Sequence, residues 1–114
     1  MRKFGQNDLV ECLHYFWNVH RQPLVHGNEI VKWAAAPKDR AGVDMAPMEV
    51  DDQRWSIWNA ANFARDHEQV MRFKGGPERN KPVYCGLMTK ESPDASEAAL
   101  MEARAKGYII DHRP

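Results

Sequence analysis

The longest stretch of the chain without an internal glycine or proline runs from Met48 to Lys74. Pro47 stands just before it, where a proline fits the first turn of a helix, and Gly75-Gly76-Pro77 follows it as a stop signal. Acidic residues lie near its start and basic residues near its end, as the helix dipole favours. The sequence therefore predicts one helix over 48–74, the longest element and the centre of the fold.

Rotated by about 100° per residue, the 48–74 helix would have one broad apolar arc. An arc covering about half of the circumference suits the central packing element of a small domain. We expect this arc to face the core, with a histidine at its edge. Its members are Trp55, Ile57, Ala60, Phe63, Ala64, His67, Val70, Met71 and Phe73.

The opposite side of the same helix would carry polar side chains with a tryptophan among them. Steps of four and three residues place most of them in one line along a helix. Trp and Arg are enriched at binding hot spots, and Arg and amide side chains also contact phosphates and bases. The predicted partner-binding residues are Arg54, Trp58, Asn62, Arg65, Gln69 and Arg72.

A structural interpretation of the same stripe stays open. Trp58 could cover the edge of a second core layer, with Arg65 and Arg72 lying over it as solvated or cation–π neighbours. Burial of the indole would distinguish this interpretation from a binding anchor.

The overall charge balance limits the classes of partner. The 114 residues include sixteen Lys and Arg and sixteen Asp and Glu, so the net charge is zero when histidines are neutral. A dedicated non-specific DNA-binding protein usually has a basic face, and the neutral balance argues against one. The length favours a single domain, residues 1–114, that buries a core without disulfides or metals.

The lack of a recognisable targeting signal and the positions of the cysteines predict a soluble cytoplasmic protein. The start, MRKFGQND, lacks the apolar region of a secretory signal, and no apolar run approaches the roughly 18 residues of a membrane-spanning helix. Cys12 and Cys85 fall inside predicted elements, which suits reduced and partly buried thiols. No membrane partner is expected.

Two further helices are predicted before the long one. Asp8 with Glu11 forms a capping box for a helix from Leu9 to about His20. A turn over 21–27 follows, and Asn28 then caps a helix from Glu29 to Ala36. This turn is longer than the roughly three or four residues of a helix-turn-helix, and the second helix is not basic. We therefore expect two packed helices, followed by a long polar connection over 37–47.

The C-terminal part predicts a strand, a helix and a strand. Val83–Thr89 and Tyr108–Ile110 are apolar and β-prone. Between them, Ser92 caps a helix that runs from Pro93 to about Lys106 and ends at Gly107. The two strands could pair in parallel or antiparallel fashion. The predicted fold is thus α+β and mostly α: three N-terminal helices, the third longest and central, then a small strand-helix-strand unit.

The segment GGPERNKP, residues 75–82, predicts a loop and is the most basic stretch of the chain. Adjacent glycine amides beside basic side chains can hold a phosphate, although the spacing fits neither the P-loop nor the dinucleotide fingerprint. The candidate phosphate or nucleic-acid contacts are Lys74, Arg79 and Lys81.

No pattern predicts catalysis, a metal or a cofactor. Cys12 and His14 would project about 160° apart on a helix, so they do not form a preformed zinc site. Cys85 precedes a glycine at the end of a strand, where nucleophiles can lie, but a packing role is the better interpretation.

The functional prediction is a small non-enzymatic regulator, adaptor or inhibitor that binds a protein partner through the outer face of the 48–74 helix. The alternatives are nucleic-acid binding by a local Arg/Lys strip, a small enzyme using Cys85, and homodimerisation through the Trp58 stripe.

Overall fold

A computed structural model of the protein describes residues 4–35, 50–75 and 78–111, with the side chains of 50–56 and 78–83 left aside. The described residues form four helices and four strands in an α+β fold that is mostly α, which confirms the predicted fold class. In chain order the elements are α1 (Gln6–His20), β1 (Val25–His26), α2 (Gly27–Ala35), α3 (Val50–Asp66), β2 (Val70–Gly75), β3 (Glu78–Leu87), α4 (Pro93–Lys106) and β4 (Ile109–Ile110).

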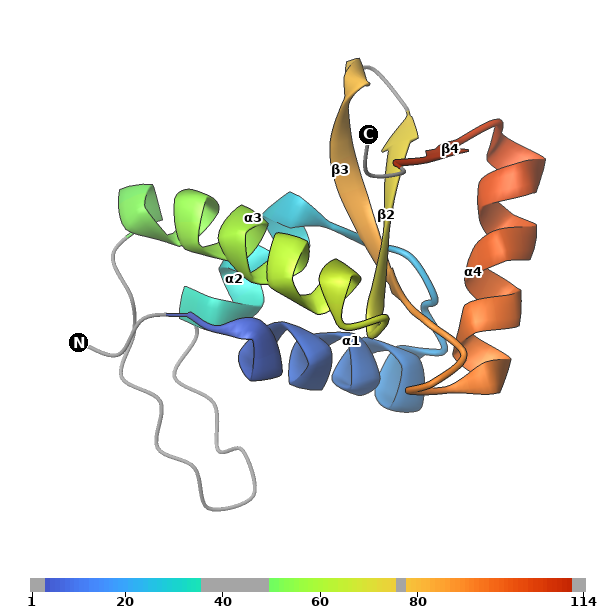
Figure 1. Ribbon diagram of the computed structural model, residues 1–114, viewed down its shortest axis with the longest axis horizontal. Helices are drawn as coiled ribbons and strands as arrows, with labels where there is room; N and C mark the ends of the chain where they lie inside the picture. The colour runs from blue at the N-terminus through green and yellow to red at the C-terminus, as the bar shows by residue number, and fades with distance from the viewer. Residues whose placement is uncertain (1–3, 36–49, 76–77, 112–114) are drawn as a thin grey trace.

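The four strands form one antiparallel sheet in the order β1-β3-β2-β4. Phe73 of β2 lies between Tyr84 of β3 and Ile110 of β4, which makes β2 an interior strand. Helix α4 stands on one side of the sheet, and α1, α2 and α3 stand on the other (Figure 1). The sheet therefore separates two layers of helix.

Two core layers follow from the alternation of side chains along β2. Val70 packs with residues of α1, α2 and α3, whereas Met71 and Phe73 pack with Ala99 and Ala103 of α4. Phe73 and Val70 are fully buried. The strand thus contributes Val70 to one layer and Met71 and Phe73 to the other, and Arg72 reaches α3 by donating to Asn62.

The predicted 48–74 helix is wrong at its C-terminal end. Helix α3 ends at Asp66, and Glu68 adopts a left-handed backbone conformation with φ of 59°. The Gln69 amide donates to the Ala64 carbonyl at 2.8 Å, and the Glu68 amide donates to the Arg65 carbonyl at 3.0 Å. These are the two hydrogen bonds of a Schellman helix end, here formed without the usual glycine.

Sheet pairing explains why the chain leaves the helix so early. Residues 70–73, Val-Met-Arg-Phe, pair with β3 on one side, and the end of β2 pairs with β4 on the other. This pairing, together with burial on both faces, outweighs the weak local preference for continuing a helix. Two expectations about the apolar arc fail as a result: Phe63 is 60% exposed, and His67 is exposed beyond the helix end.

The N-terminal boundaries also differ from the predicted ones. Helix α1 begins at Gln6, and the Gly5 amide donates to the Asp8 carboxylate at 2.8 Å, so Asp8 acts from the third helical position rather than as the cap. The predicted turn over 21–27 contains β1. The predicted connection over 37–47 lies outside the described residues.

The C-terminal elements match the prediction in type but not in pairing. The Ala95 amide donates to Ser92 Oγ at 3.2 Å at the start of α4, and Gly107 ends it with φ of 74°. β3 begins at Glu78, inside the predicted 75–82 loop. The strands β3 and β4 do not pair with each other in either direction. Both pair with β2, so they run parallel to one another with β2 between them.

The end of β2 needs a residue without a side chain at Gly75. A Cβ atom placed there would lie 2.1 Å from Cδ1 of the Tyr108 ring, which itself stacks on Tyr84 with ring centroids 4.7 Å apart. We expect Gly75→Ala to lower the free energy of unfolding by about 1–3 kcal/mol because it overpacks this contact. Urea denaturation measures the loss. The same substitution in a Tyr108→Ala background should be nearly neutral, and an equal loss in both backgrounds would contradict the steric explanation.

Candidate functional site

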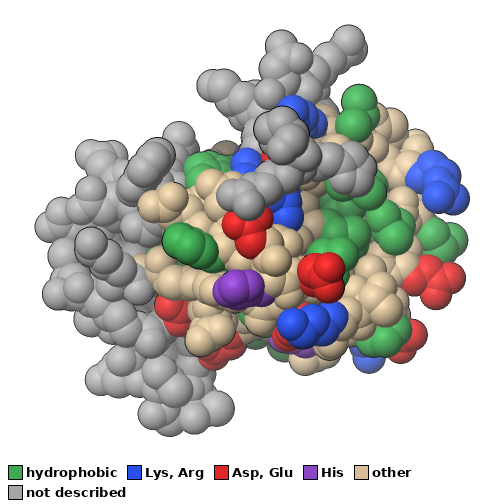
Figure 2. All heavy atoms as spheres, in the orientation of Figure 1, with side chains coloured by type: hydrophobic (Ala, Val, Ile, Leu, Met, Phe, Trp, Pro, Cys, Tyr) green, Lys and Arg blue, Asp and Glu red, His purple; other side chains and the backbone are tan. Residues whose placement is uncertain are grey.

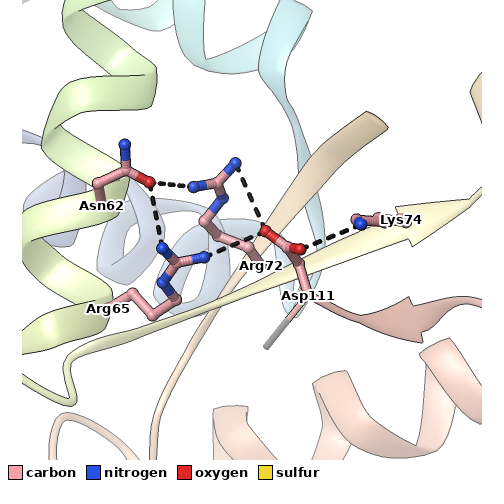
Figure 3. A network of polar contacts seen from close by, with 5 residues as sticks. All are labelled: Asn62, Arg65, Arg72, Lys74 and Asp111. Carbon is pink, nitrogen blue, oxygen red and sulfur yellow. Dashed lines mark hydrogen bonds and ion pairs between the residues drawn. The ribbon is translucent and has the colours of Figure 1, made fainter. Parts of the chain in front are cut away.

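Five polar side chains from three parts of the chain meet beside the sheet (Figure 3). Asn62 and Arg65 come from α3, Arg72 and Lys74 from β2, and Asp111 follows β4 directly. The Asp111 amide donates to the Arg72 carbonyl at 2.8 Å, which extends the β2–β4 pairing and positions the carboxylate. We refer to these five residues as the Asp111 network.

Asn62, the two arginines and Asp111 close a ring of contacts (Figure 3). The Asp111 Oδ2 atom lies 3.1 Å from Arg65 Nη1 and 3.6 Å from Arg72 Nη2. The Asn62 Oδ1 atom accepts from the other nitrogen of each guanidinium, Nη1 of Arg72 and Nη2 of Arg65. Lys74 Nζ lies outside the ring, 3.3 Å from Asp111 Oδ1. Three cations therefore share one carboxylate.

The network is largely removed from water. The exposed fraction of the side chain rises outward, from 10% at Arg72 through 15% at Asp111 and 18% at Arg65 to 35% at Lys74. Burial lowers the pKa of Arg72, while Asp111 acts in the opposite direction. The Nε atoms of Arg65 and Arg72 are buried and have no hydrogen-bond partner among the described residues. The network thus holds excess positive charge and two unsatisfied donors.

Trp58 lies beneath the Arg72 side of the network. Its indole is half-buried and packs against the core layer of α1, α2 and α3. The guanidinium carbon of Arg72 is 5.4 Å from the centre of the Trp58 ring, within the range of a cation–π contact. The structural interpretation of the stripe predicts this contact between Arg72 and Trp58. Arg72, however, reaches the indole from β2 and not from the same helix.

The predicted binding stripe is only partly assembled. Trp58, Asn62, Arg65 and Arg72 are brought together, and Lys74 from the predicted phosphate set joins them. Gln69 is not part of the network, because its side chain accepts a hydrogen bond from Gln6 of α1. The side chains of three other predicted contacts lie outside the described part of the structure: Arg54, Arg79 and Lys81.

Asp111 is the member of the network that the sequence does not predict. It follows the last predicted strand, and no local pattern marks it as a partner for Arg65, 46 residues earlier. Its position follows from the pairing of β4 with β2, which the predicted long helix excluded.

Cys85 does not have the setting of a nucleophile. It is fully buried in β3 directly opposite Arg72 in the strand register. Burial raises the pKa of the Cys85 thiol to about 12, despite the opposing effect of Arg72. Cys12 is buried as well. The geometry gives no support to a Cys85-based reaction.

We expect both thiols to resist modification in the folded protein at neutral pH. A colorimetric thiol reagent should report two thiols per chain in denaturant and almost none in the native protein over the same time. Rapid reaction of one native thiol, mapped to Cys85 by peptide mass spectrometry, would contradict this expectation and restore the nucleophile hypothesis.

The buried thiol also predicts a loss of stability in alkali. The unfolded thiol loses its proton near its ordinary pKa of 9.0, whereas native Cys85 keeps its proton until about pH 12. The free energy of unfolding should therefore be unaffected below about pH 9 and fall as the pH rises from about 9 to about 12. Tyr84, whose pKa is raised to about 12 chiefly by its hydrogen bond with Tyr108, adds to this loss. Denaturation of Cys85→Ala over the same pH range should show a shallower fall, and an unchanged slope would assign the loss elsewhere.

Within the described residues, no three His, Cys, Asp or Glu side chains are grouped so that they could hold a metal ion. No helix in the described ranges is long and apolar enough to cross a bilayer. Comparison with known proteins found no matching family model, no matching curated protein and no matching solved structure. The function must therefore be inferred from the geometry of this chain.

Proposed function

We propose that the chain is a small non-enzymatic binding domain, a regulator, adaptor or inhibitor, whose partner is a protein. The contact surface would be the outer side of α3 around Trp58 and the adjoining Asp111 network. The observation that carries the proposal is the fixed arrangement of Arg65 and Arg72 beside Trp58, with Arg65 and Lys74 still reaching solvent.

This arrangement has the properties of a binding hot spot. Arg and Trp contribute much of the energy of protein interfaces, and side chains already held in place lose less entropy on binding. Arg65 is held by Asn62 and Asp111, so its orientation is set before a partner arrives. The buried free cysteines suit a reducing compartment, and we place the proposed regulator in the cytoplasm.

The surface charge of this face favours a protein over nucleic acid as the partner. Figure 2 shows basic and acidic side chains next to one another near the middle of the face, with hydrophobic side chains gathered beside them toward α4. A duplex-binding surface is usually a continuous basic area, whereas protein interfaces combine apolar area with both signs of charge.

A pull-down from a host-like lysate, run with nuclease, tests the proposal. Wild type is compared with an Arg65→Ala/Lys74→Ala variant and with Arg104→Ala, a matched control on the exposed side of α4. We expect wild type and the control to capture a partner protein that stays bound after nuclease treatment, and the double variant not to capture it. Thermal unfolding confirms that all three chains fold. Equal recovery by the double variant would refute the proposed surface. Sedimentation shows whether the retained partner is a second copy of this chain.

Nucleic-acid binding is the second candidate, and one observation favours it. Arg65, Arg72 and Lys74 are neighbours in space, and β3 brings the backbone of residues 79–81 to the same end of the sheet as Lys74. Phosphate contacts release counterions, so affinity for an oligonucleotide should fall steeply with salt. A nuclease-sensitive partner with this salt dependence would replace the protein proposal.

A further inference from the structure

The Asp111 network contains more positive charge than its own groups compensate. Among the described residues, Arg65, Arg72 and Lys74 contribute three positive charges and Asp111 one negative charge. Unpaired charge in a buried setting is costly, and Arg72 is only 8% exposed. The remaining two positive charges are equal in size to the charge of a phosphate monoester at neutral pH, about −1.5 to −2.

Within the described residues, the network also has hydrogen-bond donors without acceptors, in addition to its excess positive charge. Each guanidinium directs its two Nη atoms at Asn62 and Asp111 (Figure 3), and the buried Nε atoms of Arg65 and Arg72 have no partner in the described part of the chain. Two arginines and a lysine are the groups that bind phosphate and carboxylate oxygens, since Arg presents a fork of donors and Lys a point charge. The free donors belong to the two cations that already hold the Asp111 carboxylate.

The internal carboxylate directly follows a short edge strand. β4 is two residues long and, among the described strands, pairs with β2 alone, and Ile109 within it is 68% exposed. Short edge elements open at low free energy compared with the core. Asp111 can therefore leave the cations by a local opening that separates Ile110 from Phe73 and keeps the pairing of β2 with β3.

We propose that the Asp111 network is an oxyanion site that Asp111 occupies as an internal ligand, and that a phosphate monoester on a protein partner takes the place of the Asp111 carboxylate. This inference rests on the proposed function in that the partner is a protein, and it adds the chemical group that is recognised. In the free domain Asp111 competes with that group and lowers its apparent affinity.

The first test uses inorganic phosphate as the probe, with binding measured by calorimetry and by two-dimensional NMR. Removing the competing charge in Asp111→Asn should raise the phosphate affinity about tenfold over wild type, and Arg104→Ala should leave the affinity unchanged. Lys74→Ala removes the most exposed cation, so it should fold normally and lower the affinity about tenfold relative to wild type. Equal phosphate affinity in wild type, Asp111→Asn and Lys74→Ala, or no binding to any of them, would overturn the inference.

A second set of probes identifies the source of the group. A phosphoserine peptide should bind more tightly than inorganic phosphate and than its unphosphorylated form, with the same ranking of variants. Tighter binding of inorganic phosphate or of a single-stranded oligonucleotide than of the phosphopeptide would overturn the protein source. Phosphate-independent capture of a partner in the pull-down, together with a negative phosphate result, would leave the proposed protein interface standing and remove only the oxyanion site.

Discussion

Phe73→Ala lowers the free energy of unfolding by about 3–5 kcal/mol, whereas Phe63→Ala lowers it by no more than about 0.5 kcal/mol. The two substitutions are chemically identical, and the two residues lie ten positions apart. The Phe73 side chain is completely buried against α4, so its removal leaves a cavity. Phe63 is 60% exposed on α3 and loses little on truncation.

Urea denaturation of the two variants and of wild type measures both values, with unchanged m-values as the check that unfolding remains comparable. The pair also tests the break between α3 and β2. On a continuous 48–74 helix both rings would lie on the apolar arc, and the two substitutions would lower the free energy of unfolding by similar amounts. Similar losses at the two positions would therefore contradict the strand at 70–75.

Asp111→Ala carries the second large effect, a loss of about 3–5 kcal/mol. The substitution leaves Arg65, Arg72 and Lys74 without their shared carboxylate, and the side chains of Arg65 and Arg72 are 18% and 10% exposed. Removing one member of a buried charge group costs more than the pair itself contributes, because the remaining charges stay desolvated. The loss should change little between low and moderate salt, since buried charges are poorly screened.

Asp94→Ala is the matched control, because Asp94 is an exposed acid in the first turn of α4 and should cost at most about 1 kcal/mol. Thermal and urea unfolding in phosphate-free buffer measure both variants. A loss at Asp111 no larger than that at Asp94 would show that the cations are solvated and that the network contributes little. Added phosphate should recover part of the Asp111→Ala loss by binding the folded state, which connects this measurement to the oxyanion site.

The sequence predicts the bounds of α4 well because the signals there are themselves local. Ser92 and Gly107 bound α4 as expected, because a hydroxyl cap and a left-handed glycine act within a few residues. The end of α3 carries no such signal. The helix ends at Asp66, and Glu68, a residue with no preference for the left-handed conformation, adopts it because β3 and β4 hold residues 70–75 in a strand. That cause lies elsewhere in the chain and leaves no local trace.

The candidate site shows the same division. Helical spacing correctly groups Trp58, Asn62 and Arg65, which do lie on one side of α3. Arg72 joins them for a different reason: it lies on β2, after the chain has left the helix, and its side chain extends from the sheet toward α3. Asp111, the residue that organises the cations, enters through the β2–β4 pairing, so it could be found only from the tertiary structure.

The strand order β1-β3-β2-β4 also determines how this chain must assemble. Among the described strands, β2 and β3 are the only sheet neighbours that follow one another directly, so their hairpin can form by a short local closure. Joining β1 requires Val25 to find Cys85, and joining β4 requires Ile110 to find Phe73, so each closes a much longer loop and carries a larger entropic cost. We therefore expect the β2–β3 hairpin to form first, and the two edge strands, with the charge compensation that Asp111 provides, to join it later.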